Sequence, residues 1–135
     1  MRILIADDNA VVRRALRQLV EAREGFEVCA EAQDGYDAIE QAIQYKPDLV
    51  LLDLVMPNLD GLKAAARISE LLPGTRMVMV TLHDSPQVRA DAKKVGILQV
   101  IPKFDASSLR RIVDALLETK LTADATGAER LLTPK

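Results

Sequence analysis

The stretch that decides the fold lies at residues 49–61 and reads Leu-Val-Leu-Leu-Asp-Leu-Val-Met-Pro-Asn-Leu-Asp-Gly. Its first four residues form an unbroken apolar run, too short for a helix, which is typical of a strand buried on both faces of a parallel sheet. Asp53 follows directly, and the Pro-Asn pair at 57–58 and the Asp-Gly pair at 60–61 favour turns. We therefore expect a carboxylate at the carboxyl end of a central strand, where open α/β sheets bind ligands.

The composition is that of one ordinary globular domain. The chain has 135 residues, 49% of them hydrophobic, and 18 basic side chains nearly balance 20 acidic ones. The formal net charge of −2 argues against a basic face that holds nucleic acid. A lone Cys29 cannot form an internal disulfide, and no apolar run approaches the roughly 20 residues that span a bilayer. We expect a soluble cytoplasmic protein that does not contact a membrane.

Strand-like and helix-like segments alternate along the chain. The expected strands are residues 2–6, 26–32, 49–52, 76–80 and 99–102. The expected helices are residues 10–24, 35–45, 62–72 and 86–95, and a last one that starts at 106 or 107 and reaches 117. Five such units imply a parallel sheet covered on both faces and joined by right-handed crossovers. We predict an α/β flavodoxin-like (βα)5 doubly wound fold with strand order 2-1-3-4-5.

The expected helices carry apolar positions at helical spacing. In the first helix these inward positions are Val12, Ala15, Leu16 and Leu19, and the arginines on the other side are Arg13, Arg14 and Arg17. In the second helix the inward positions are Ile39, Ala42 and Ile43. Polar caps mark the helix starts, with Asn9 before the first helix and Ser85 before the fourth.

Polar side chains gather where the predicted strands end. Asp7 and Asp8 follow the first strand and Asp53 the third, and strand order 2-1-3-4-5 places these two ends side by side. Thr81 and Lys103 follow the fourth and fifth strands and approach the same crevice. Crowded carboxylates repel one another, and a hard divalent cation that prefers oxygen ligands relieves this repulsion. The sequence therefore predicts a Mg²⁺ site at this edge of the sheet.

These motifs occur in a fixed order along the chain: Asp7-Asp8-Asn9, then Asp53-Leu54-Val55-Met56-Pro57 with Asp60-Gly61, then Thr81, then Lys103. In that order they resemble the receiver domain of bacterial two-component response regulators. The resemblance covers residues 2–120, and it rests on the whole set, because each fragment alone is common in other proteins.

The resemblance implies a phosphorylation site. Asp53 would accept a phosphoryl group from a sensor histidine kinase, and Thr81 and Lys103 would contact the phosphoryl oxygens. The expected Mg²⁺ ligands are Asp8, Asp53, Asp7 and the backbone carbonyl of Val55. The domain would be a phosphoacceptor and not an enzyme with turnover on an external substrate, and relatives form homodimers when phosphorylated.

Three positions depart from the family pattern. Val100 stands where receivers usually carry an aromatic residue, Leu82 where a small residue follows the threonine, and Phe104 where a proline follows the lysine. A valine cannot swing between buried and exposed positions with a large change in area. We therefore expect phosphorylation without the usual threonine-aromatic switch. His83 is expected to be an exposed loop residue.

Other functions of this fold class fit the sequence less well. A haloacid-dehalogenase-like phosphatase would need a second aspartate two residues after the nucleophile, where Val55 stands. A flavodoxin-like binder would need a phosphate loop rich in Ser, Thr and Gly after the first strand, where the chain reads Asp7-Asp8-Asn9.

The C-terminal tail suggests a further domain. Residues 121–128 lack apolar periodicity and are typical of a linker. Residues 131–135 read Leu-Leu-Thr-Pro-Lys, in which Thr as N-cap and Pro as first helical residue start a helix. This segment resembles the opening of the helix-turn-helix domain of NarL/LuxR-type transcription regulators. We predict a receiver domain at 1–120 and, at 121–135, a linker and the start of a DNA-binding domain through which alone DNA is contacted. The alternative is a standalone receiver that regulates a protein partner.

Overall fold

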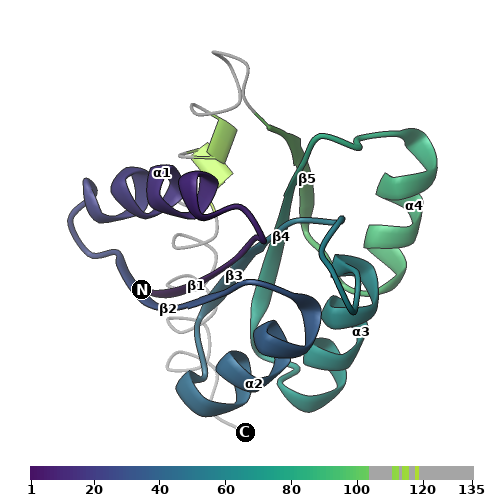
Figure 1. Cartoon of the computed structure of the whole chain (residues 1–135), viewed down its shortest axis with the longest axis horizontal. Helices are drawn as coiled ribbons and strands as arrows, with labels where there is room; N and C mark the ends of the chain where they lie inside the picture. Colours follow the sequence, from purple (N-terminus) through teal and green to yellow (C-terminus); the bar gives the residue numbers. More distant parts are fainter. Residues whose placement is uncertain (104–110, 113, 116–117, 119–135) are drawn as a thin grey trace, which may run out of the picture.

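The computed structural model describes residues 1–103, 111–112, 114–115 and 118. In this part of the chain five strands alternate with four helices (Figure 1). The strands are β1 (Arg2–Ala6), β2 (Glu27–Ala32), β3 (Leu49–Leu52), β4 (Arg76–Thr81) and β5 (Gln99–Pro102). The helices are α1 (Ala10–Glu21), α2 (Gly35–Tyr45), α3 (Gly61–Leu71) and α4 (Pro86–Lys94).

All strand pairs are parallel, and the sheet order is β2-β1-β3-β4-β5. This confirms the predicted doubly wound fold. In the central pairs Ile3 lies beside Leu49 and Val50 beside Met77. The order changes direction between β1 and β3, so their carboxyl ends form the switch point at which such sheets bind ligands.

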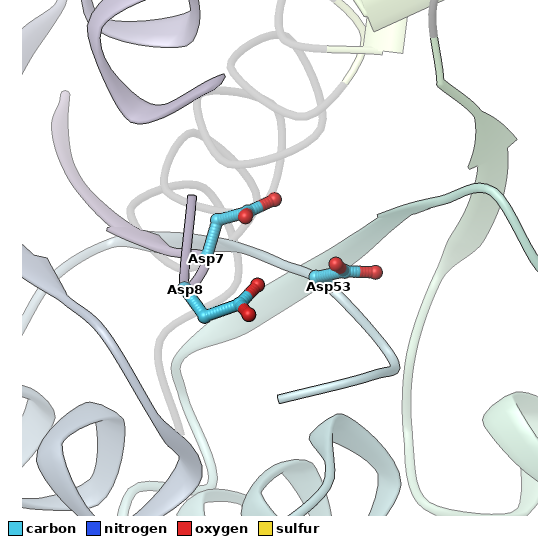
Figure 2. A group of neighbouring side chains, drawn as sticks. All are labelled: Asp7, Asp8 and Asp53. Atoms are coloured by element: carbon cyan, nitrogen blue, oxygen red, sulfur yellow. The ribbon is translucent and has the colours of Figure 1, made fainter. Parts of the chain in front are cut away.

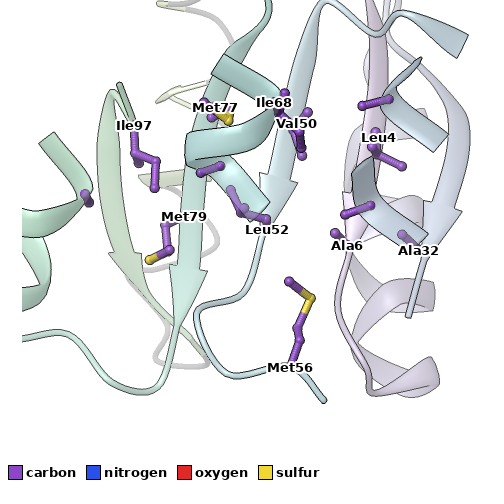
Figure 3. Close-up of a cluster of buried hydrophobic side chains, with 14 of the residues drawn as sticks. Leu4, Ala6, Ala32, Val50, Leu52, Met56, Ile68, Met77, Met79 and Ile97 are labelled. Carbon is purple, nitrogen blue, oxygen red and sulfur yellow. The ribbon is translucent and has the colours of Figure 1, made fainter. Parts of the chain in front are cut away.

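Two apolar cores lie on the two faces of the sheet, because successive residues of a strand point to opposite faces. One core joins β1, β3, β4 and β5 to α1, and Val78 and Val80 belong to it. The other joins the sheet to α2, α3 and α4, and Met77 and Met79 belong to it (Figure 3). Met56, from the segment after β3, also packs in this second core (Figure 3).

The rotation of two helices differs from the prediction. In α1 the buried residues are Val12, Leu16 and Val20, whereas Ala15 is exposed. In α2 the buried face is lined by Gly35, Ala38 and Ala42, and Ile43 is 48% exposed. These small residues allow α2 to lie close to its neighbours, and this packing fixes the rotation of the helix more than its largest apolar side chains do.

The predicted last helix is described only in part. Its described residues, Arg111, Ile112, Asp114, Ala115 and Glu118, are helical, and Ile112 and Ala115 are buried in the core that contains α1. Phe104 and the predicted linker and domain start at 121–135 lie outside the described residues. None of the helices described is both long enough and apolar enough to cross a membrane.

Candidate functional site

Two acidic residues are fixed at the switch point by backbone hydrogen bonds. The Asp7 N–H donates to the Ala32 carbonyl of β2 at 3.0 Å, and the Asp53 N–H donates to the Ala6 carbonyl of β1 at 3.0 Å. Each bond continues the sheet one residue past the strand end. The backbone of both acids is therefore as well fixed as that of the sheet itself.

The carboxylates of Asp7, Asp8 and Asp53 meet at the ends of β1 and β3 (Figure 2). Each residue offers one oxygen, and these oxygens lie within 4.8 Å of one another. Asp7 is 1% and Asp53 6% exposed, whereas Asp8 is open to solvent. The structure thus brings together the acids that the strand order predicts.

Lys103 joins two of these acids from the end of β5. Its Nζ lies 2.6 Å from Asp7 Oδ2 and 2.7 Å from Asp53 Oδ2, and all three side chains are at most 8% exposed. Burial alone would lower the pKa of Lys103, but the hydrogen bonds and charges of Asp53 and Asp7 outweigh it and raise that pKa. The ammonium therefore stays protonated and holds positive charge between the two carboxylates.

The acids fit a hard divalent cation. Burial raises the pKa of Asp7 above its ordinary value, even though Lys103 and the Asn9 N–H act in the opposite direction. Asp53 Oδ1 is buried and accepts no hydrogen bond from the described residues. A buried carboxylate oxygen without a partner is costly, and Mg²⁺ prefers carboxylate oxygens. The described acids thus provide ligands of the kind that Mg²⁺ takes.

Thr81 ends β4, which lies between β3 and β5 in the sheet. Thr81 is fully buried, its Oγ1 accepts the His83 N–H at 3.2 Å, and its carbonyl accepts the Lys103 N–H at 3.0 Å. Leu82 is 67% exposed, and His83 is exposed as expected. Val100 is buried in the core beside α4. Val55, whose backbone carbonyl is a predicted ligand, is 52% exposed.

The segment between β3 and α3 folds back tightly onto Asp53. The Gly61 N–H donates to the Leu54 carbonyl at 2.7 Å, and a Cβ added at Gly61 would lie only 2.0 Å from the Asp53 carbonyl oxygen. Asp60 caps α3 by accepting the Lys63 N–H at 2.9 Å. Glycine at 61 therefore allows the start of α3 to support the backbone of Asp53 directly.

Arg13 was predicted on the outer side of the first helix, but it contacts the acid cluster. Its side chain is 18% exposed, and its Nη1 donates to the Asp7 carbonyl at 2.6 Å. A signal was available, because a cation near a helix N-terminus opposes the helix dipole and needs a nearby partner. Arg13 lies about one helical turn after the Asn9 cap. This position is close enough to Asp7 along the chain for such a contact.

The chain is a doubly wound domain with three acidic side chains at the switch point, where such sheets bind ligands. The response regulator receiver domain model matches residues 3–116. The chain belongs to this family.

The individual relatives include a methylesterase that is much longer than this chain. The chain is 34% identical over 115 residues to protein-glutamate methylesterase/protein-glutamine glutaminase 5 of Myxococcus xanthus, covering 84% of this chain and 33% of that protein. The chain spans less than half of the length of curated relatives such as this one.

Solved structures give the same fold. A DNA-binding response regulator of the LuxR family from Staphylococcus aureus matches with a TM-score of 0.79 at 26% identity, over 87% of this chain and 97% of that one. A chain of the CheX-CheY-BeF3-Mg complex from Borrelia burgdorferi is also similar, with a TM-score of 0.78 at 28% identity, over 86% of this chain and 89% of that one. The receiver family thus includes similar domains in regulators with different outputs.

Proposed function

We propose that Asp53 accepts a phosphoryl group from a sensor histidine kinase and that Mg²⁺ supports the reaction. The observation that carries this proposal is the buried Asp53 Oδ1, which accepts no hydrogen bond from the described residues although Oδ2 is paired with Lys103. Asp53 Oδ1 is thus held in place, and no hydrogen-bond donor among the described residues occupies it. The similar Borrelia burgdorferi structure, described as a complex with BeF3 and Mg, supports the choice of cation.

The proposed reaction moves a phosphoryl group between two residues. An oxygen of Asp53 forms a bond to phosphorus while the phosphorus–nitrogen bond of the kinase phosphohistidine breaks, and the released imidazole nitrogen keeps the electron pair and takes a proton from water. Such transfers depend on positioning and charge neutralisation. Lys103 can neutralise charge from the side of β5, and the Thr81 hydroxyl can donate a hydrogen bond to a phosphoryl oxygen.

Mg²⁺, when bound, would neutralise charge on the phosphoryl oxygens. Its proposed ligands are Asp8, Asp53, Asp7 and the backbone carbonyl of Val55. The exposure of Asp8 leaves this acid accessible for an incoming ion. The domain acts as a phosphoacceptor, and its own chemistry is limited to self-phosphorylation from small phosphodonors and self-dephosphorylation.

We expect Asp53→Asn to abolish phosphorylation, because an amide oxygen is a far weaker nucleophile than a carboxylate. Acetyl phosphate with Mg²⁺ should add one phosphoryl group to the wild type, measured as a mass increase of the intact protein, and none to the variant. The matched control is Asp60→Asn, which alters a nearby acid but keeps a good helix cap. Equal labelling of Asp53→Asn and wild type would exclude Asp53 as the acceptor.

We also propose that this receiver controls transcription through an attached DNA-binding domain. The sequence Leu-Thr-Pro-Lys at residues 132–135, a pattern typical of a helix start, and the similarity to a LuxR-family DNA-binding regulator support this output. The similarity to a methylesterase makes an attached enzyme domain the second candidate. The gene sequence downstream of residue 135 decides between them, since the first predicts a helix-turn-helix and the second a domain of the methylesterase type.

The proposed regulator pairs with a second copy when phosphorylated. Leu82 and Leu98 are 67% and 60% exposed, and Leu98 lines a pocket of about 620 Å³ with residues of α4, β5 and Arg111. Covering such apolar side chains would favour association. Sedimentation with and without beryllofluoride, a mimic of the phosphoryl group, measures this pairing. Identical profiles over a wide concentration range would contradict it.

Activation is expected to bypass Val100. This residue is 9% exposed and packed in the core, and its short β-branched side chain cannot swing out with a large change in exposed area. Beryllofluoride should therefore shift the amide resonances of residues 81–87 and leave the Val100 methyl resonances nearly unchanged. Methyl shifts at Val100 as large as the loop shifts, measured by NMR in one titration, would show that the valine takes part in the switch.

A further inference from the structure

Each polar group of Asp7 has a partner in the structure. The Asp7 N–H donates to Ala32, its Oδ1 accepts the Asn9 N–H at 2.9 Å, and its Oδ2 lies 2.6 Å from Lys103 Nζ. The remaining polar group of Asp7 is its carbonyl. That carbonyl accepts a hydrogen bond from Arg13 Nη1 at 2.6 Å, so a side chain of α1 completes the set.

Arg13 is itself fixed by a second contact. Its Nε lies 3.3 Å from Glu31 Oε1, and Glu31 is the β2 residue next to Ala32. Glu31 also pairs with Arg17, which forms an ion pair with Glu21 at 3.0 Å. The guanidinium of Arg13 therefore bridges α1, the end of β1 and β2, with its planar set of donors directed at two acceptors.

We propose that Arg13, held by Glu31, is a positioning residue for the metal-binding acids Asp7 and Asp8. This inference rests on the proposed function, since it concerns the same Mg²⁺ site. The carbonyl that Arg13 holds belongs to the peptide that links the two acids, so its orientation fixes the directions in which both side chains leave the backbone. Groups that orient metal ligands from behind contribute strongly to metal affinity.

Charge and orientation predict opposite results for removal of Arg13. If the positive charge dominated, Arg13→Gln would relieve repulsion and strengthen Mg²⁺ binding. Glu31 lies at ion-pair distance and offsets that charge, so orientation should dominate. We expect Arg13→Gln to weaken Mg²⁺ binding by about tenfold. The maximum phosphorylation rate at saturating Mg²⁺ should stay close to that of the wild type, because Asp53 and Lys103 are untouched.

The matched control is Arg17→Gln. This substitution removes the same charge and a contact with the same partner, Glu31, but it removes no contact with Asp7. It should bind Mg²⁺ nearly as the wild type does. Arg13→Lys keeps the charge without the planar fork and should fall between Arg13→Gln and the wild type. Calorimetric titration of the whole 135-residue chain with MgCl2 measures the affinities, and urea unfolding verifies that each variant is folded.

The amide resonances of Asp8 and Asn9 give a second readout, which reports directly on the peptide that Arg13 holds. In Arg13→Gln they should shift already without Mg²⁺, whereas in Arg17→Gln they should not. A folded Arg13→Gln with unchanged or tighter Mg²⁺ binding overturns the positioning role and leaves the proposed function intact. A wild type that binds no Mg²⁺ overturns the proposed function and the positioning role with it.

Discussion

Replacing Gly61 with alanine is expected to lower the free energy of unfolding by about 3 kcal/mol, at the upper end of the usual cost of overpacking. The added Cβ would lie 2.0 Å from the Asp53 carbonyl oxygen, 2.9 Å from its carbonyl carbon and 3.0 Å from Leu54 Cα. All three are backbone atoms, so no side-chain rotation can relieve the clash. The start of α3 must move away from the end of β3, which also displaces Asp53.

Gly74→Ala is the matched control, because a Cβ at Gly74 would meet no atom within 4 Å among those described. This substitution should be neutral or stabilise the protein slightly by restricting the unfolded chain. Urea unfolding followed by circular dichroism compares both variants with the wild type. The steric argument would be wrong if Gly61→Ala and Gly74→Ala unfolded at the same urea concentration.

The sequence predicted the strands and their order because local patterns and topology agree. The apolar run at residues 49–52 suits only a central strand, and all four of its residues are buried. Parallel strands of a doubly wound sheet end at one edge, so acids placed after β1 and β3 had to approach one another. The meeting of Asp7, Asp8 and Asp53 follows from that constraint without knowledge of any distance.

The rotation of the helices could not be predicted in the same way. Apolar spacing in α2 indicates a buried side, but Ala38 and Ala42 occupy it while the larger Ile43 lies half-exposed. Close packing favours small residues where elements approach one another, and this requirement depends on the neighbours and not on the helix. The contact of Arg13 with Asp7 was also not predicted, although an arginine in the first turn of a helix is a signal for a nearby partner.

Sequence patterns also gave no information about how Lys103 divides its contacts. A lysine at the end of the fifth strand was expected near the acids, but not shared between Asp7 and Asp53 at 2.6 and 2.7 Å. Such a shared contact depends on the rotamers of three side chains in a buried space. It has a direct consequence for metal binding, because the oxygens held by the ammonium belong to the proposed ligands.

Lys103→Met is expected to strengthen Mg²⁺ binding by about tenfold. The ammonium holds the Oδ2 atoms of Asp7 and Asp53, so it competes with a cation bound by the same carboxylates. A hydrogen bond between charged groups contributes about 1.5–3 kcal/mol, and about 1.4 kcal/mol corresponds to a factor of ten in affinity. Loss of one such competing contact accounts for the expected change.

The same substitution should destabilise the metal-free protein by about 3 kcal/mol, because two buried carboxylates lose the cation that they share. Mg²⁺ binds the folded state and stabilises it by mass action. The free energy of unfolding of Lys103→Met should therefore rise more steeply with Mg²⁺ concentration than that of the wild type. At high Mg²⁺ the two proteins should approach one another in stability.

Calorimetric titration with MgCl2 and urea unfolding at several Mg²⁺ concentrations measure the two effects. Lys94→Met is the control, since it removes the same formal charge from an exposed position at the end of α4. A general electrostatic effect would strengthen Mg²⁺ binding equally in both variants, whereas direct competition requires the gain at position 103 alone. If Lys103→Met bound Mg²⁺ no more tightly than Lys94→Met, the ammonium could not be a competitor for the metal site.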